Sequence, residues 1–169
     1  MRIRWRGLEL PTRVVCDDKT LTANYGRFTA EPFERGFGTT VGNSIRRVLL
    51  SSLEGAAVTA VKIAGVSHEF TTVPGVMEDV TEILLNVKQI RLRMHVDEPR
   101  TLTVKSDKKG VLKAGDLAGD ASVEIVNPDH HLVTLSEPVP FEMSLEVRKG
   151  RGYQTAEDAE PEQKEIGRI

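Results

Sequence analysis

The chain has 169 residues, enough for one ordinary domain or two small ones with a sizeable buried core. Apolar residues make up 39% of it, and with 14 glycines the total approaches half, which excludes wholesale disorder. Lys and Arg (23) nearly balance Asp and Glu (25), and the net charge of -2 disfavours a role in coating nucleic acid. Because no apolar window approaches about 18 residues and no signal peptide is recognisable, we expect a cytoplasmic protein without a membrane partner.

The first elements expected in chain order are a hairpin and a helix. β-branched and aromatic residues in 12–16 and 20–31 flank a polar turn and predict two short strands. An N-cap at Thr39 or Thr40 then precedes apolar residues at helical spacing, and Gly55 is expected to end this helix.

A second helix is predicted after a turn at 72–75, with apolar residues from Val76 to Val87 and with Glu78 and Asp79 in its first turn. Beyond it the apolar period changes from helical to alternating, which predicts a small antiparallel β-rich body and an α+β fold. The predicted strands carry Val58, Ala60 and Ile63; Ile90, Leu92, Met94 and Val96; Leu102 and Val104; Val123 and Ile125; Leu132, Val133 and Leu135; and Phe141, Met143, Leu145 and Val147.

No motif in the sequence predicts nucleotide binding, metal binding or catalysis. The glycines of 36–44 resemble a phosphate loop, but Asn43 stands where a lysine is required. His130 and His131 are adjacent and cannot chelate one metal together, so a pair in a surface loop is expected. The single cysteine, Cys16, is interpreted as a small apolar filler. We therefore expect no catalytic residue, no metal and no cofactor.

The two predicted helices each carry a leucine outside their apolar stripe. In the first helix Leu50 lies among Arg46 and Arg47, and in the second Leu85 lies near Glu82. Arginines beside an apolar anchor are typical of interface cores, which indicates a docking surface; the alternative, that Arg46 and Arg47 are merely solvated, fits the sequence equally well. The stripe of the first helix is itself broad and comprises Val41, Ile45, Val48, Leu49 and Leu53.

Residues 31–58, EPFERGFGTTVGNSIRRVLLSSLEGAAV, closely resemble the N-terminal domain of bacterial RNA polymerase alpha subunits. The likeness continues through GVSHEF at 65–70, GVMEDVTEILLNVK at 75–88, VEIV at 123–126, RKGRGY at 148–153 and IGRI at 166–169. The resemblance implies a non-catalytic assembly scaffold of the DNA-directed RNA polymerase, a nucleotidyltransferase complex. Alpha subunits of this family form a homodimer and recruit the two large catalytic subunits, beta and beta-prime. No direct DNA contact is expected from this chain.

The resemblance also assigns site residues by matching motif positions. The positions expected to bind the large subunits are Arg46, Arg47, Leu50, Glu82 and Lys88. The positions expected on the dimerisation helix are Phe37, Val41, Ile45 and Val48.

The family fold implies two parts. Residues 1–54, a hairpin plus a long helix, correspond to the first half of the dimerisation subdomain. Residues 55–169 correspond to an inserted β-rich subdomain with one helix, and its acidic segment near 154–168 is expected to be mobile. The family sequence continues beyond the point that matches Ile169, so we expect a fragment or truncated product that dimerises poorly as it stands. The alternative is a stand-alone protein-interaction module.

Overall fold

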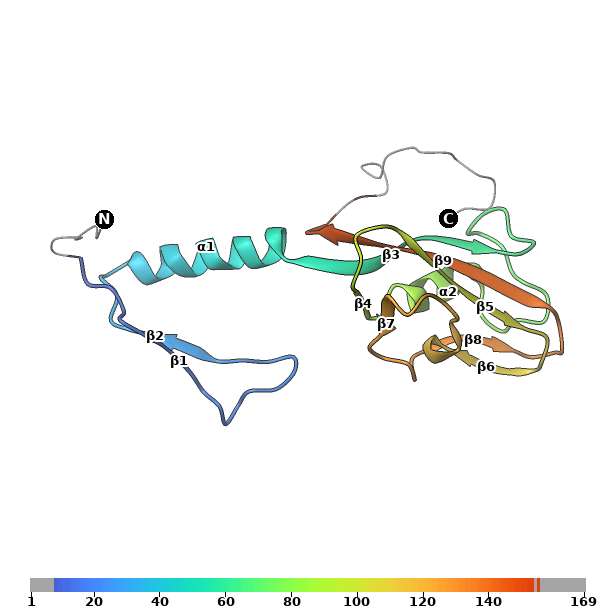
Figure 1. Ribbon diagram of the computed structural model, residues 1–169, viewed down its shortest axis with the longest axis horizontal. Helices are drawn as coiled ribbons and strands as arrows, with labels where there is room; N and C mark the ends of the chain where they lie inside the picture. The colour runs from blue at the N-terminus through green and yellow to red at the C-terminus, as the bar shows by residue number, and fades with distance from the viewer. Residues whose placement is uncertain (1–7, 154, 156–169) are drawn as a thin grey trace. The chain divides into compact units, whose positions relative to one another are not determined.

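The computed structural model describes residues 8–153 and 155 (Figure 1). The chain divides into two compact units, Met1–Ser51 and Ser52–Ile169, and each has its own secondary structure. The acidic segment 154–168 lies outside the described residues, apart from Thr155. Among the helices of the described ranges, none is long and apolar enough to cross a membrane.

The first unit contains the predicted hairpin. Strands β1 (Val14–Cys16) and β2 (Phe28–Ala30) pair antiparallel. The second strand is shorter than predicted because residues 17–27 form successive turns: the Thr20 amide donates to the Asp17 carbonyl at 3.1 Å, for example. A polar turn follows β1 as the sequence predicts, but it is only the first part of a long loop.

The long helix α1 (Phe37–Ser52) is confirmed, with both ends displaced from the predicted ones. It begins two residues before Thr39, because Gly36 adopts the left-handed region at φ 86° and turns the chain into the helix. The Phe33 and Phe37 rings lie 6.3 Å apart across this turn. Gly55 was expected to end α1, and this was wrong: it lies inside the following strand.

The second unit is built on an antiparallel five-stranded sheet of order β5-β9-β3-β4-β7. Its strands are β3 (Glu54–Ile63), β4 (Leu92–Met94), β5 (Arg100–Ser106), β7 (Val123–Ile125) and β9 (Phe141–Arg151). A separate pair joins β6 (Gly110–Lys113), which was not predicted, to β8 (His131–Leu135), and a short 3₁₀ turn, η1 (Ala114–Asp116), follows β6.

Strand β3 carries a bulge that changes which of its side chains face the core. Val58 pairs with Val147, and Ala60 pairs with Glu146, so Thr59 is an extra residue on β3. Ala56 and Val58 pack against the core before the bulge, whereas Val61 and Ile63 are buried after it. The predicted strand at Val58, Ala60 and Ile63 therefore exists, although its apolar residues do not follow one alternation.

The second helix, α2 (Val80–Val87), begins later than the sequence predicts. The Asp79 side chain caps it by accepting a hydrogen bond from the Glu82 amide at 2.7 Å. Val76 and Met77, expected in its first turn, instead run antiparallel to β8, where the Met77 amide donates to a β8 carbonyl. The apolar residues at helical spacing from Val76 to Val87 therefore belong to two structures: a segment that pairs with β8, and helix α2.

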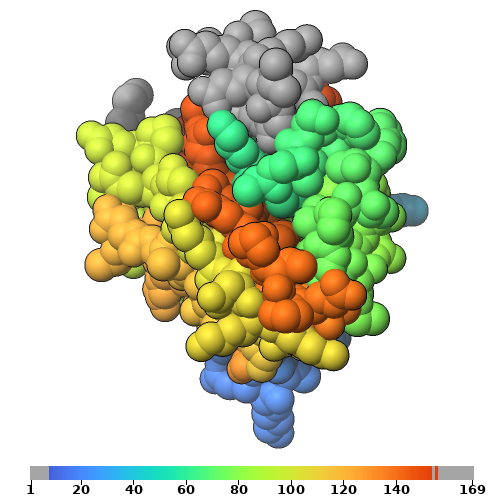
Figure 2. Space-filling view, turned by 90° about the vertical axis from the view of Figure 1, so that its right-hand side faces the viewer, coloured from blue at the N-terminus to red at the C-terminus, as the bar shows by residue number. Residues whose placement is uncertain are grey.

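The core lies in the second unit. Figure 1 shows α2 against the sheet and near β8, and Figure 2 shows β9 (orange-red) between β5 (yellow) and the segment after β3 (green). The buried apolar residues come from the helix and from most strands, and none of the described polar residues is fully buried. They include Val61, Ile63, Val80, Ile83, Val87, Met94, Leu102, Val104, Leu132, Val133, Leu135, Phe141, Met143, Leu145 and Val147. The α+β fold class is confirmed.

Candidate functional site

Helix α1 has no buried residue in the described chain, although it carries a broad apolar stripe. Ile45, Val48 and Leu49 are 54%, 57% and 53% exposed, and the other two apolar side chains of the stripe, Phe37 and Val41, are half-buried. At about 100° per residue these five side chains lie within one third of the helix circumference. All four positions expected at dimerisation therefore share one open face, the α1 apolar stripe.

The opposite side of α1 carries the arginine pair. Arg46 and Arg47 are exposed, and Leu50 between them on the helical wheel is 67% exposed. Guanidinium groups offer several donors in a plane, and an adjacent leucine offers an apolar anchor, which together suit a protein partner. We call this set of three the α1 arginine face.

Helix α2 presents the remaining predicted positions in the second unit. Val80, Ile83 and Val87 face the core, and Leu85, 54% exposed, lies on the opposite side. Helix geometry places Leu85 between Glu82 and Lys88, both exposed, and Lys88 is the C-cap residue. These three residues form the α2 exposed face. The five positions expected to bind the large subunits thus lie on two surfaces, one on each helix.

Glu78 was predicted in the first turn of α2, but it lies before the helix, where its side chain forms hydrogen bonds with residues of β8. One carboxylate oxygen accepts the Thr134 amide at 2.8 Å, and the other lies 2.8 Å from Nε2 of His131. Burial of this carboxyl group opposes its ionisation, but the hydrogen bonds from Thr134 and His131 outweigh that effect and lower the pKa of Glu78. The ionised carboxylate is therefore the form that the fold stabilises.

His130 lies at the end of a turn, as expected for a surface loop, but His131 is the first residue of β8. Both residues are half-buried, and each makes a hydrogen bond with α2 or with the segment just before it. Nε2 of His130 lies 2.9 Å from the Asn86 carbonyl oxygen, and Nδ2 of Asn86 donates to the Leu132 carbonyl at 3.0 Å. Sequence reasoning missed these roles because the partners are more than 40 residues away along the chain, although two adjacent polar rings at the start of an apolar strand were a visible signal.

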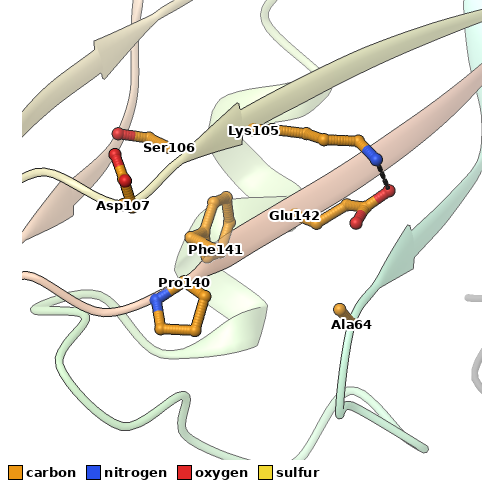
Figure 3. Close-up of a pocket in the computed structure, with 7 residues that line it drawn as sticks. All are labelled: Ala64, Lys105, Ser106, Asp107, Pro140, Phe141 and Glu142. Carbon is orange, nitrogen blue, oxygen red and sulfur yellow. Dashed lines mark ion pairs between the residues drawn. The ribbon is translucent and has the colours of Figure 1, made fainter.

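A pocket of about 440 Å³ opens where β5 ends and β9 begins (Figure 3). Lys105 and Glu142 line it and pair with each other at 2.7 Å, beside Pro140 and Phe141. Its two facing charges thus satisfy each other, and Ser106 and Asp107 also line the pocket. In the ranges that the structure describes, no cluster of three His, Cys, Asp or Glu side chains could hold a metal ion.

The described residues thus form an antiparallel α+β sheet body and two helices that each expose an apolar and charged face. Residues 61–169 match the family described as the RNA polymerase Rpb3/RpoA insert domain. The chain belongs to this family.

Relatives cover the whole chain. It is 53% identical over 169 residues to a DNA-directed RNA polymerase subunit alpha of Rhodopirellula baltica, with 100% of this chain and 51% of the relative covered. The corresponding subunit of Geobacter metallireducens is 52% identical over 163 residues, with 96% and 48% covered. That of Desulfovibrio desulfuricans is 50% identical over 165 residues, with 98% and 48% covered. The chain spans about half the length of the curated relatives that it matches.

Proposed function

We propose that this chain is a non-catalytic assembly scaffold of a bacterial DNA-directed RNA polymerase, acting in the cytoplasm. In this proposal the α1 apolar stripe packs against a second alpha subunit. The α1 arginine face and the α2 exposed face recruit the two large catalytic subunits, beta and beta-prime. Residues 1–54 then contribute to the dimerisation subdomain, and 55–169 form the inserted subdomain. The polymerase chemistry belongs to the large subunits, and this chain holds no cofactor.

The observation that carries the proposal is a 16-residue helix with no buried residue. Burial of apolar surface stabilises by about 25 cal/mol per Å², so a stripe that the described chain leaves open is a favourable site for a partner. The arginine pair and Leu50 on the other side of the same helix provide a second, chemically different surface. One helix can in this way contact two partners at once.

The test is Arg47→Ala, with capture of the co-expressed large subunits by the tagged chain as the readout. Truncating an arginine at a desolvated interface costs about 2 kcal/mol, so capture should weaken by roughly 30-fold. Arg47 is exposed, and its loss should change the stability of the fold by no more than about 0.5 kcal/mol. Self-association, read by sedimentation, should equal that of the parent chain because Arg47 lies outside the apolar stripe.

The matched control is Arg27→Ala, which removes an exposed arginine of the hairpin and should leave capture unchanged. Undiminished capture by Arg47→Ala would refute the docking role. If neither the parent chain nor the control captures a large subunit, the alternative of a stand-alone interaction module is favoured. An unfolded Arg47→Ala chain would instead assign this arginine a structural role.

A further inference from the structure

Two adjacent histidines reach the two ends of one helix. Nε2 of His131 lies 2.8 Å from a carboxylate oxygen of Glu78, which stands two residues before α2 begins. Nε2 of His130 lies 2.9 Å from the carbonyl oxygen of Asn86, the penultimate residue of α2. The two rings thus contact the chain at both ends of the same eight-residue helix.

Each partner fixes which atom carries the proton. The Asn86 carbonyl oxygen can only accept a hydrogen bond, and so can the ionised carboxylate of Glu78. Nε2–H is therefore the donor in both rings. The Asn86 carbonyl oxygen also accepts the Gln89 amide at 3.0 Å. Because the last carbonyls of a helix carry partial negative charge, a second donor from a ring N–H is favourable there.

α2 depends on such contacts from outside the helix. A helix of eight residues is well below the length that is stable alone in water, so its placement follows from its tertiary contacts. Val80, Ile83 and Val87 fix the depth at which the helix packs. Sliding or rotation about that apolar contact is opposed by directional hydrogen bonds, and the two histidines supply one at each end.

We propose that His130 and His131 are positioning residues that clamp α2 at both ends and hold its exposed face in the geometry that the large subunits bind. This inference rests on the proposed function for the α2 exposed face. It adds that binding depends on two residues, in β8 and in the turn before it, that lie outside the α2 exposed face.

The experiment compares His130→Ala, His131→Ala and the glutamine variants His130→Gln and His131→Gln in the whole chain. The glutamine side chain can donate from Nε2 to the same acceptors. Loss of one net hydrogen bond should speed amide hydrogen exchange in α2 about fivefold in each alanine variant and weaken capture of the large subunits by a similar factor. Both effects should return toward the parent values in the glutamine variants.

The control is His68→Ala, an exposed histidine of the same unit, which should leave both readouts unchanged. Exchange in β5 and β9 should not change in any variant, because a general loss of stability would accelerate the whole unit. Unaltered exchange in α2, or equal acceleration across the sheet, would overturn the clamp.

The double variant Glu82→Ala with Lys88→Ala separates this inference from the proposed function. If it captures the large subunits normally, the α2 exposed face is not a docking surface and the proposed function fails there. If it loses capture while the histidine variants keep it despite faster exchange, docking at α2 stands and the positioning role of the histidines is overturned.

Discussion

The two helices have similar amphipathic sequences and opposite surroundings. α1 is 16 residues long and buries none of them, whereas α2 is eight residues long and buries Val80, Ile83 and Val87 almost completely. An apolar stripe at helical spacing therefore indicates that the helix is covered, but it does not identify the element or partner that covers it. For α2 the cover is the sheet of its own unit. For α1 the described residues supply little of it, which leaves a partner as the proposed cover.

The largest expected contrast is between a core leucine and a helix-surface leucine. Leu145→Ala in β9 removes a side chain that is fully buried and should lower the free energy of unfolding by about 2–5 kcal/mol. Leu50→Ala, at a position 67% exposed on α1, should change it by less than about 0.5 kcal/mol. Urea unfolding followed by circular dichroism measures both. Equal costs would show that α1 is packed in the free chain and would end the comparison.

A smaller contrast concerns how the two helices begin. Asp79→Ala removes the carboxylate that accepts the Glu82 amide and should destabilise the second unit by about 1 kcal/mol. Thr39→Ala, an exposed position in the first turn of α1, serves as the matched change and should cost under about 0.5 kcal/mol. Thermal unfolding of the two variants measures both changes in stability. A neutral Asp79→Ala would mean that burial alone fixes the start of α2.

The smallest effect is expected from pH. The folded state lowers the pKa of Glu78, so ionised Glu78 contributes stability above its ordinary value near 4.5. That contribution is lost as the pH falls through the ordinary value and then through the lower pKa of the folded state. The stability gap between the parent chain and Glu78→Gln should therefore be widest at neutral pH and should shrink on acidification. Urea titrations at a series of pH values test this, and a gap that widens toward acid would contradict it.

Much of the fold follows from local patterns. The alternation at Phe141, Met143, Leu145 and Val147 is a half-buried strand in both the sequence and the structure. The helical spacing from Val41 onward likewise predicts α1, because a 3.6-residue period over four turns has few other solutions.

What local patterns could not supply was pairing with distant segments. Val76 and Met77 continued the helical spacing of α2, but antiparallel contacts with β8 drew them out of the helix. Gly55 has the composition of a helix end, yet strand pairing with Gly150 places it in β3. β6 was missed because the apolar run at Val111 and Leu112 is too short to show a period.

The residues of the candidate site likewise fall into those that the sequence indicates and those that only the structure reveals. Positions such as Arg47 and Glu82 came from family likeness, and their exposure on α1 and α2 accords with docking, which remains a prediction. The contacts of His130 and His131 with α2 link residues more than 40 positions apart, and no spacing rule reaches that far.

The bulge at Thr59 has a consequence for how β3 tolerates changes of length. Its two halves place their side chains in opposite frames, with even-numbered residues against the core before the bulge and odd-numbered residues after it. Thr59 is the residue that joins the two frames: without it, Val58 would face the core, Ala60 would face away and Val61 would face the core in one continuous alternation. The strand can therefore lose Thr59 and keep the same side chains against the core, whereas loss of Ala57 with the bulge kept would turn Ala56 away from it.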